Sequence, residues 1–302
     1  MYDLIIVGGG PAGLTAAVYA LRKRLNVLVV SQDLGGKTNY DLALPGMEMH
    51  QVIRGLEVVK KFRRELEYLD FARRQATVNT IAKKENLFTV KTTGGTELTA
   101  KSVILATGVQ AQRLNVPGER DYVGRGLSYS ALSYAPLFLG KRAVVIGDEE
   151  RGLRAVAELA QVAALVHFIT PMHEVLDTPL SRKLAIDSPN VIVLAEYTVK
   201  AIRGNGYADY VVVESPQGKE TGIDTDGIFI ELGLLANSDP IKGWVELDEQ
   251  GRVIIDNRNR TSCPGLFAAG DVTNAYAEQV LIAVGEGAKA ALSAYEYLLY
   301  TF

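Results

Sequence analysis

A glycine-rich segment near the start of the chain has the residue types and spacing to hold phosphate groups. Gly8-Gly9-Gly10-Pro11-Ala12-Gly13 follows an apolar run over 4–7 and precedes an Ala- and Leu-rich stretch over 14–21. Gly8 allows a tight turn, Gly10 lets the backbone approach a pyrophosphate, and Gly13 lets a helix pack closely on a strand. The N-terminus of that helix offers N–H groups and the positive end of its dipole to the phosphates. The predicted dinucleotide-binding residues are Gly8, Gly10, Pro11, Ala12 and Gly13.

The elements around this segment give the turn its context. A second apolar run over 27–30 follows the expected helix, so the order is strand, glycine-rich turn, helix and strand. This order favours a nucleotide site over the alternative, a tight turn that binds nothing. An acidic residue near the end of the second strand is expected to contact a ribose hydroxyl, and the candidates there are Ser31, Gln32 and Asp33.

Two more apolar runs end in short motifs. One ends in Ala106-Thr107-Gly108 and the other in Gly270-Asp271, while Gln279 and Val280 open the last long helical stretch. In order and spacing these motifs and the glycine turn resemble the low-molecular-weight thioredoxin reductase family of FAD flavoproteins, from residue 2 to about 298. The resemblance implies bound FAD, with the Asp271 carboxylate on the ribityl chain and the N-terminus of the last helix facing the flavin.

Gly35-Gly36 matches the family's loop near the flavin, where a glutamine usually follows. Lys37 stands at that position instead. A lysine there can place a cation near the flavin and stabilise its anionic reduced form. An ordinary surface lysine is the competing interpretation. Asp33, Gly36 and Lys37 are therefore included among the predicted cofactor-binding residues.

The resemblance also implies the domain organisation. It predicts an α/β fold with two Rossmann-like, three-layer nucleotide-binding domains, the second inserted into the first. The FAD-binding domain is expected over 1–112 and 242–302, and the inserted NAD(P)-type domain over 113–241. Turn signals at Val116-Pro117-Gly118 and Asp239-Pro240 support the two joints.

Hydrophobic spacing predicts further elements. Apolar residues at helical spacing predict an amphipathic helix over 50–69, whose Lys and Arg residues form a solvated face. Apolar runs on either side of Gly94-Gly95 predict a hairpin. The expected strands of the inserted domain are 143–147, 165–169, 191–194, 210–213 and 227–232.

The glycine turn of the inserted domain departs from the family pattern. The sequence reads Gly147-Asp148-Glu149-Glu150-Arg151-Gly152, with Glu149 where the close-approach glycine belongs. A carboxylate about 5 Å from a phosphate charge opposes binding by about 3 kcal/mol, roughly a hundredfold in affinity, unless Arg151 or a rearranged loop compensates. The family's His-Arg-Arg motif for the 2′-phosphate falls at Thr170-Pro171-Met172, which has no arginine. Ordinary NADPH binding is not expected, and the candidates for contacting a second nucleotide are Gly147, Asp148, Glu149, Arg151 and His173.

The family's redox-active Cys-x-x-Cys pair is also altered. Ser130 and Ser133 occupy both cysteine positions, and Tyr134 stands where an aspartate usually follows. A hydroxyl cannot replace a thiolate in two-electron exchange. Either the natural protein has no dithiol, or paired Cys→Ser substitutions have been introduced. Ser130 and Ser133 are the predicted catalytic positions in either situation.

Some branches of the family work without NADPH, which suggests what replaces it. Some resemble acceptors of electrons from ferredoxin, and one, a diflavin-linked disulfide oxidoreductase of oxygenic photosynthetic prokaryotes, holds a second FAD. The altered second turn resembles these branches, so a second FAD in the inserted domain is a possible cofactor. The candidates for stacking on a flavin are Tyr129, Tyr134, Tyr300 and Phe302, although the last two equally suit a helix end or a dimer contact.

Composition limits the class of protein. The 302 residues are 48% hydrophobic with a net charge of −3, which allows a core and gives no basic excess for nucleic acid. The single cysteine excludes an intrachain disulfide, and the three histidines lack metal-ligand spacing. No apolar run reaches about 18 residues and no leader is recognised, so a cytoplasmic location is expected. The resemblance implies a homodimer and a thioredoxin- or ferredoxin-like partner.

These patterns lead to three hypotheses. The leading one is an FAD-dependent, thioredoxin-reductase-like oxidoreductase that does not use NADPH in the usual way. It would pass electrons between its flavin and a second flavin, a disulfide or a protein partner. The first alternative is an NAD(P)H–FAD reductase of the ferredoxin–NADP reductase type, without a dithiol. The second is a flavin-binding protein that has lost its chemistry.

Overall fold

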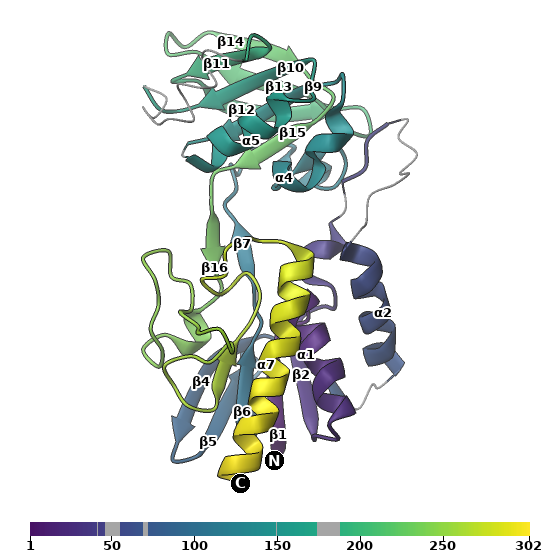
Figure 1. Cartoon of the computed structure of the whole chain (residues 1–302). Helices are drawn as coiled ribbons and strands as arrows, with labels where there is room; N and C mark the ends of the chain where they lie inside the picture. The colour runs from purple at the N-terminus through teal and green to yellow at the C-terminus, as the bar shows by residue number, and fades with distance from the viewer. Residues whose placement is uncertain (41, 46–54, 69–71, 149, 174–187) are drawn as a thin grey trace. The chain divides into compact units, whose positions relative to one another are not determined.

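The structure is a computed structural model that describes residues 1–40, 42–45, 55–68, 72–148, 150–173 and 188–302. The chain divides into two compact units (Figure 1). The first unit comprises Met1–Asn39, Gln51–Gln110 and Leu235–Phe302, and the second comprises Tyr40–His50 and Ala111–Leu234. Each unit has its own parallel strands and its own cores.

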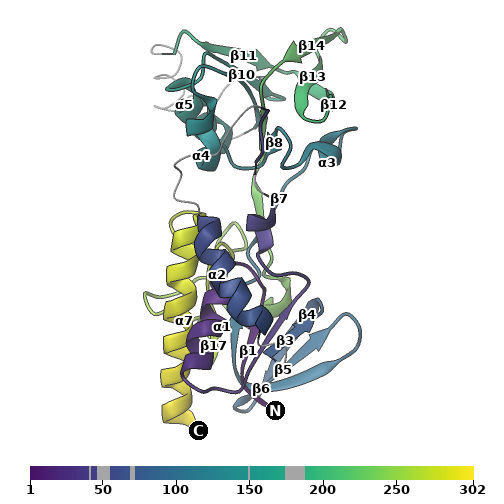
Figure 2. The same cartoon turned by 90° about the vertical axis from the view of Figure 1, so that its right-hand side faces the viewer.

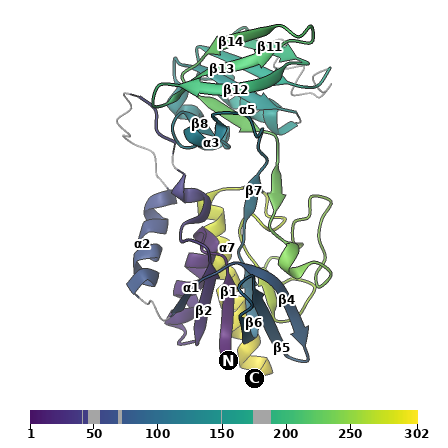
Figure 3. The same cartoon turned by 180° about the vertical axis from the view of Figure 1, so that it is seen from behind.

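The first unit is built on a seven-stranded sheet. Its strands are β1 (Tyr2–Val7), β2 (Val27–Ser31), β3 (Arg73–Gln75), β4 (Val78–Lys84), β5 (Leu87–Thr92), β6 (Glu97–Leu105) and β17 (Leu266–Ala268). They pair in the order β3-β2-β1-β6-β5-β4, and β17 also pairs with β6. β1 runs parallel to β2 and β6, whereas β5 runs antiparallel to β4 and β6 (Figure 3).

Three helices cover one face of this sheet: α1 (Pro11–Arg22), α2 (Gly55–Tyr68) and α7 (Val280–Thr301). α1 packs against both α7 and α2 (Figure 2). Alternation along β1 explains the two cores, because successive side chains of a strand point to opposite faces. Leu4 and Ile6 pack with the helices, whereas Ile5 and Val7 pack with residues of β4, β5 and the segment before α7.

The second unit contains a five-stranded parallel sheet and a separate three-stranded antiparallel one. In pairing order the parallel strands are β11 (Val191–Ala195), β10 (Leu165–Thr170), β9 (Arg142–Gly147), β15 (Ile228–Glu231) and β8 (Leu127–Ser128). The antiparallel strands are β12 (Thr198–Gly204), β13 (Ala208–Glu214) and β14 (Glu220–Asp224). The helical elements are α3 (Glu119–Tyr122), α4 (Ala131–Tyr134), η3 (Ala135–Phe138) and α5 (Glu150–Ala160).

Both faces of the parallel sheet in the second unit are covered. Ala143 and Val145 of β9 pack with α4 and α5, while Val144 and Ile146 pack with β12 and β13. Helices, parallel sheet and antiparallel strands therefore form three layers in the second unit. The predicted α/β fold with two Rossmann-like units is confirmed.

Two segments lie in other units than the sequence predicted. Ala43 pairs with Arg125, and Leu42 joins a core of the second unit. Ile241, in the short turn η4 (Asp239–Ile241), packs in a core of the first unit. Burial of an apolar side chain fixes the unit to which its segment belongs. The predicted boundaries differ because they were drawn at the nearby turn signals. The strands β7 (Val109–Ala111) and β16 (Leu234–Ala236) pair at the joints.

Most expected elements are present. The predicted hairpin is formed by β5 and β6, with Val90 opposite Leu98. The predicted helix over 50–69 is described as α2, and residues 50–54 and 69 lie outside the described part of the chain. Within the described ranges, no helix has the length and apolar character needed to cross a membrane. The same residues include no cluster of acidic, histidine or cysteine side chains suited to a metal ion.

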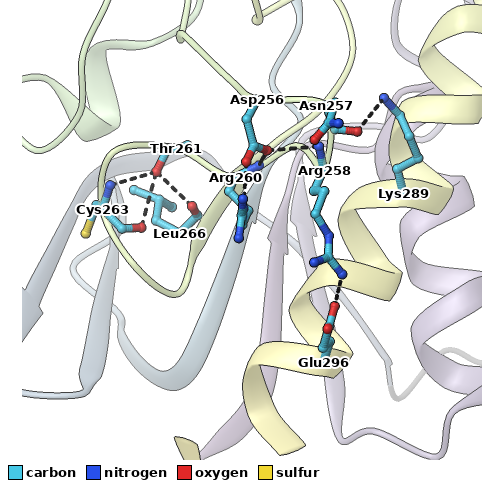
Figure 4. A network of polar contacts seen from close by, with 9 residues as sticks. All are labelled: Asp256, Asn257, Arg258, Arg260, Thr261, Cys263, Leu266, Lys289 and Glu296. Atoms are coloured by element: carbon cyan, nitrogen blue, oxygen red, sulfur yellow. Dashed lines mark hydrogen bonds and ion pairs between the residues drawn. The ribbon is translucent and has the colours of Figure 1, made fainter. Parts of the chain in front are cut away.

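A polar network ties the segment before β17 to α7 (Figure 4). Asp256 accepts hydrogen bonds from the backbone N–H groups of Arg258 and Arg260, both at 2.9 Å. Burial raises the pKa of the Asp256 carboxyl, but hydrogen bonds from Arg260 and Arg258 outweigh it and hold the pKa below its usual value. Arg258 also contacts Glu296 of α7. The network thus holds the approach to β17 against the last helix.

Cys263 lies in the same network. Its backbone N–H donates to Thr261 Oγ1 at 3.1 Å, and Thr261 Oγ1 donates to the carbonyl of Leu266 at 2.8 Å (Figure 4). Burial raises the pKa of the Cys263 thiol, although Lys83 acts in the opposite direction. Cys263 is therefore a weakly reactive thiol at neutral pH, as a small structural residue would be.

Candidate functional site

The strands that precede the predicted motifs end at the same edge of the sheet in the first unit. Val7 of β1 is in register with Leu105 of β6, and Leu105 with Ala268 of β17. The glycine turn and the segments Ala106–Gly108 and Gly270-Asp271 each follow one of these strands. Ligands of open α/β sheets bind at the carboxyl ends of the strands, where the strand order reverses. We call these three motifs, with Gly35-Gly36-Lys37, the glycine-turn site.

Close backbone packing explains two of the glycines. Gly8 has a φ of +116°, and a Cβ there would lie 2.1 Å from the carbonyl oxygen of Ala106. A Cβ on Gly13 would lie 2.0 Å from the carbonyl oxygen of Gly8. Neither position admits a side chain, so both glycines serve the fold itself by holding the turn against α1 and Ala106.

Gly10 differs, because nothing crowds it. Its φ of −73° and ψ of −176° are open to any residue, and a Cβ there would meet no atom within 4 Å. Gly10 is the N-cap of α1, which has no side-chain cap and has Pro11 in its first turn. The first-turn N–H groups of a helix have no partner within the helix. Free N–H groups beside open space suit a pyrophosphate.

The loop after β2 lies against this turn. The N–H of Gly35 donates to the carbonyl of Gly9 at 2.7 Å, and a Cβ on Gly36 would lie 3.2 Å from Gly10 Cα. Asp33 Oδ1 accepts a hydrogen bond from the N–H of Gly36 at 3.1 Å. The predicted residues Asp33 and Gly36 are therefore brought to Gly10, and Asp33 shapes the loop.

Lys37 forms an ion pair with Asp271. Its Nζ lies 2.6 Å from Asp271 Oδ2, and the Asp271 side chain is only 13% exposed. The pair joins the short turn η1 (Gly36–Asn39) to the segment that follows β17. Lys37 is therefore more than a solvated surface lysine, because it neutralises the carboxylate predicted to contact the ribityl chain.

Glu286 is a residue of this site that sequence reasoning missed. Its side chain is buried in α7, and Oε2 accepts the N–H of Gly270 at 2.8 Å and the Thr273 hydroxyl at 3.2 Å. Gly287, next to it, is required because a Cβ there would lie 2.1 Å from the carbonyl oxygen of Ala12. An acidic residue within an otherwise apolar helix was the available signal. Glu286 positions the turn that carries Asp271.

Replacing Glu286 by alanine is expected to lower the free energy of unfolding of the first unit by about 2 kcal/mol, because the buried N–H of Gly270 loses its acceptor. Glu286→Gln keeps an acceptor and should lose roughly half as much. Urea unfolding of the flavin-free protein measures both, with Glu158→Ala, an exposed position on α5, as the control. Equal stability of Glu286→Ala and the parent would contradict this role.

Asn237 holds the Ala106–Gly108 segment and was also missed. Its Nδ2 donates to the carbonyl of Thr107 at 3.0 Å, and Thr107 Oγ1 donates to the Asn237 carbonyl at 2.8 Å. The backbone N–H of Asn237 donates to the carbonyl of Gly108 at 3.0 Å. The sequence marked this stretch only as a linker, by Asp239-Pro240. These contacts give Thr107 a positioning role.

At the start of α7, Gln279 is the N-cap and Val280 the first helical residue, again with no side-chain cap. A Cβ on Gly270 would lie 3.0 Å from Ala12 Cβ and 3.6 Å from Ala283 Cβ, which places the first turns of α1 and α7 beside Gly270. Two uncapped helix N-termini thus adjoin the glycine-turn site. The residues predicted to hold FAD therefore fit that cofactor: open space at Gly10, free N–H groups and the Asp271 carboxylate.

The second unit retains part of a nucleotide turn. A Cβ on Gly147 would lie 2.8 Å from Gly152 Cα, and one on Gly152 would lie 3.1 Å from Phe168 Cε2. The first and last glycines of the motif thus still allow β9 and α5 to pack closely. Glu149, which replaces the glycine between them, lies outside the described residues.

Arg151, which was considered as a partner for a phosphate, forms an ion pair instead. Its Nε lies 2.6 Å from Glu231 Oε2, and the Glu231 side chain is 3% exposed. Glu231 Oε1 also accepts the N–H of Ala131 at 2.6 Å. Glu231, at the end of β15, was not singled out from the sequence. His173 is largely exposed and lies 2.9 Å from Glu196 through Nδ1.

Ser130 and Ser133 contact each other. Their hydroxyl oxygens lie 2.9 Å apart, with Ser130 at the N-cap of α4. The N–H of Ser130 donates to Ser128 Oγ at 3.2 Å. The two positions that carry cysteines in the thioredoxin reductase family therefore keep the proximity that a disulfide needs.

The profile of one protein family, described as pyridine nucleotide-disulphide oxidoreductase, matches residues 2–287. The chain belongs to this family. The family binds FAD, in agreement with the glycine-turn site, and it is a family of oxidoreductases, as the sequence predicted.

The oxidoreductase is similar to several named proteins. The F subunit of alkyl hydroperoxide reductase from Pseudomonas putida is 38% identical over 99% of this chain and 59% of its own length. The NADH dehydrogenase of Bacillus subtilis (strain 168) is 32% identical, again over 99% and 59%. This chain therefore spans 59% of the length of either relative. The structure of thioredoxin reductase from Streptococcus pyogenes MGAS5005 matches with a TM-score of 0.90 and 32% identity, covering 100% of this chain and 99% of the other.

Two of the four predicted flavin-stacking residues of the oxidoreductase are engaged within the second unit. The Tyr129 hydroxyl donates to Glu119 Oε1 at 2.8 Å, and burial, reinforced by Glu119, raises the pKa of Tyr129 well above its usual value. Tyr134 packs against the core beside α5.

Tyr300 and Phe302 lie at the C-terminal end of α7. About twenty helical residues, or roughly 30 Å, separate them from the end of α7 near Gly270. Both side chains are exposed, and Phe302 lies under Lys101 Nζ, 5.3 Å from the ring centroid. The structure thus places both residues away from the glycine-turn site of their own chain, because one rigid helix separates the two ends.

Proposed function

We propose that the chain is an FAD-dependent oxidoreductase that exchanges electrons with a redox protein or a disulfide and does not take them from NADPH in the usual way. FAD bound at the glycine-turn site would supply the two-electron chemistry. The observation that carries the proposal is the Gly147 turn. Its two structural glycines still pack, while the position for close approach carries Glu149 and Arg151 is held by Glu231.

The serine pair supports the same proposal. Ser130 and Ser133 touch but cannot form a disulfide, whether they are natural or introduced. In this sequence, electrons must therefore pass between the flavin and its partner without a dithiol at these positions. If cysteines are native there, the natural reaction is flavin–disulfide exchange. The proposal for this chain is therefore electron exchange without the usual NADPH turn and without a dithiol at these two positions.

A second candidate function is direct reduction of the bound flavin by NADH or NADPH without a dithiol. It is favoured by the Bacillus subtilis relative, which is named NADH dehydrogenase and is 32% identical. NADH has no 2′-phosphate, so its binding does not need the arginines missing at 170–172. It still needs close approach of the backbone to the pyrophosphate. Glu149 therefore opposes NADH as well as NADPH.

Anaerobic titration of the purified holoprotein separates these functions. We expect one flavin per chain, measured from the absorbance of the denatured protein, and no bleaching of that flavin by stoichiometric NADPH or NADH. Rapid bleaching by either nucleotide would overturn the proposal in favour of the second candidate. Flavin that neither a nucleotide nor dithiothreitol, thioredoxin or ferredoxin can oxidise or reduce would indicate a flavin-binding protein without chemistry.

A double variant tests whether the acidic residues after Gly147 oppose NADPH binding. Glu149→Gly with Glu150→Asn restores a small, uncharged turn and should improve NADPH binding by roughly a hundredfold, as measured by calorimetry. Glu158→Gln, which removes one exposed charge from α5, is the control and should change nothing. Unchanged NADPH binding in the double variant would show that this loop does not decide the nucleotide.

Three finer expectations stay proposals. The comparisons support one FAD and do not support a second one, so the proposal includes one FAD per chain, and the flavin count tests it. A homodimer and a thioredoxin- or ferredoxin-like partner follow from the family resemblance. Light scattering of the holoprotein and direct partner titration measure them.

A further inference from the structure

A buried ion pair lies beside the glycine turn of the second unit. Glu231 is the last residue of β15, where it is in register with Gly147 at the end of β9. Its side chain is 3% exposed, and Oε2 accepts a hydrogen bond at 2.6 Å from Arg151 Nε, in the first turn of α5. In doubly wound folds a dinucleotide binds at this edge of the sheet, with its phosphates at the N-terminus of the helix. The ion pair therefore lies where a second nucleotide would bind.

The Glu231 carboxylate is held from a second side. Its Oε1 accepts a hydrogen bond at 2.6 Å from the backbone N–H of Ala131, the first residue of α4. One oxygen therefore holds α4 and the other holds Arg151, so the carboxylate cannot follow Arg151 toward a ligand. A buried carboxylate that loses its counter-charge strongly destabilises a protein. A phosphate that binds Arg151 therefore has to leave Glu231 buried without that charge.

Arg151 is the more accessible member of the pair, since its side chain is 30% exposed. A guanidinium group is always charged at neutral pH, and its planar donors match the oxygens of a phosphate. Once released from Glu231, Arg151 has both the charge and the position to bind a phosphate at the N-terminus of α5. Its present partner, rather than its place in the fold, withholds it from a nucleotide.

We propose that Glu231 is a specificity-determining residue, which keeps dinucleotides such as NADPH and NADH off the Gly147 turn by holding Arg151 in a buried ion pair. The inference rests on the proposed function, because it explains why Arg151 does not offset the charge that Glu149 brings to the same turn. The packing of Gly147 on Gly152 is that of a nucleotide turn, so the exclusion comes from charge and not from the backbone.

Glu231→Gln is expected to improve nucleotide binding. The amide oxygen still accepts the N–H of Ala131, while Arg151 loses its ionic partner and becomes free to bind a phosphate. NADPH is titrated by calorimetry into FAD-loaded protein, so that the glycine-turn site is already occupied. The Kd for NADPH should fall about tenfold, the effect of one charge-assisted hydrogen bond. The same Kd in the parent and in Glu231→Gln, or no measurable binding to either, would overturn the inference.

A second substitution tests whether Arg151 is responsible for the gain. Adding Arg151→Gln to Glu231→Gln removes the guanidinium group and should return the Kd for NADPH to that of the parent. A gain that persists without Arg151 would show that loss of a negative charge alone improves binding. That outcome would also overturn the inference, because it gives Arg151 no part in the exclusion.

Melting temperatures separate this role from a purely structural one. Arg151→Gln alone should lower the melting temperature, since it leaves the buried Glu231 carboxylate without its counter-charge, and the double variant should recover most of the loss. An ion pair that only stabilises the fold would give the same melting temperatures but leave NADPH binding to Glu231→Gln unchanged. The combination of both measurements therefore decides between the two roles.

Asp226→Asn is the matched control. Asp226 Oδ1 lies 3.4 Å from a terminal nitrogen of Arg142, which begins β9, at the opposite end of this strand from Gly147. The change removes one negative charge from an ion pair of the same unit and should leave the Kd for NADPH unchanged. A parent protein that binds NADPH tightly contradicts the proposed function itself. A parent that excludes NADPH, with a Glu231→Gln variant that excludes it equally, contradicts only this inference.

Discussion

Replacing Gly10 by alanine is expected to raise the Kd for FAD about a hundredfold while leaving the fold intact. A methyl group at this position fills the open space beside the first-turn N–H groups of α1. Losing two charge-assisted hydrogen bonds to a pyrophosphate corresponds to about 3 kcal/mol, or roughly two orders of magnitude in affinity. Flavin fluorescence titration of the flavin-free protein measures the effect.

The stability of the Gly10→Ala protein distinguishes a lost ligand contact from a lost fold. The backbone at Gly10 suits alanine and no atom is near, so the free energy of unfolding should change by less than about 1 kcal/mol, mainly because alanine is a poorer N-cap. Gly13→Ala is the comparison, since its Cβ would lie 2.0 Å from a carbonyl oxygen and should destabilise the first unit by about 3 kcal/mol. Full FAD occupancy in Gly10→Ala would refute the glycine-turn site.

Placing cysteines at both Ser130 and Ser133 is expected to create a disulfide in air. The two hydroxyl oxygens are 2.9 Å apart, and two sulfur atoms need to approach to about 2.05 Å, which small side-chain rotations supply. The mass of the intact protein should fall by about 2 Da relative to the reduced form, the mass of the two hydrogen atoms lost when the S–S bond forms. The denatured protein should then show one thiol, from Cys263, without reductant and three with it.

The single variant Ser130→Cys controls for nonspecific oxidation, because it has no neighbouring thiol to pair with. Cys263 competes poorly, since burial raises the pKa of its thiol. Three free thiols in the air-oxidised double variant would show that these positions have lost the geometry of a redox pair. A closed disulfide would show that the two positions keep the geometry of a redox pair and lack only the sulfur atoms.

The elements of the first unit were predictable where the local sequence pattern favours the same structure as the packing of the whole unit. The apolar run before Gly8, the glycine spacing and the helix after Gly13 specify one structure at every level, and β1, α1 and β2 follow it. The same agreement holds for the hairpin around Gly94-Gly95. At these places sequence neighbours are also neighbours in space, so a short window contains the necessary information.

Residues that act across long sequence separations were not predictable in this way. Glu286 acts on Gly270, Asn237 on Thr107, and Glu231 on Arg151. Each is a polar residue near or within an apolar run, and its partner is known only once the sheet and helices are assembled.

Short or half-exposed strands were a second limit. β4, β12 and β14 were not predicted, because their exposed faces carry charged or polar residues and their apolar residues are too few to give a clear alternation. Each is nevertheless held by an antiparallel neighbour, β5 or β13. Pairing with a strongly apolar strand compensates for a weak pattern.

The contact between Gly147 and Gly152 separates two properties of the second unit that one motif usually encodes together. This pair sets how tightly β9 meets α5, whereas we propose that Glu149, which lies between them in the sequence, decides which nucleotide the loop admits. A chain built this way can exchange one small-molecule preference for another by single substitutions, without repacking its core. Evolutionary drift at that position, in either direction, would leave the architecture unchanged.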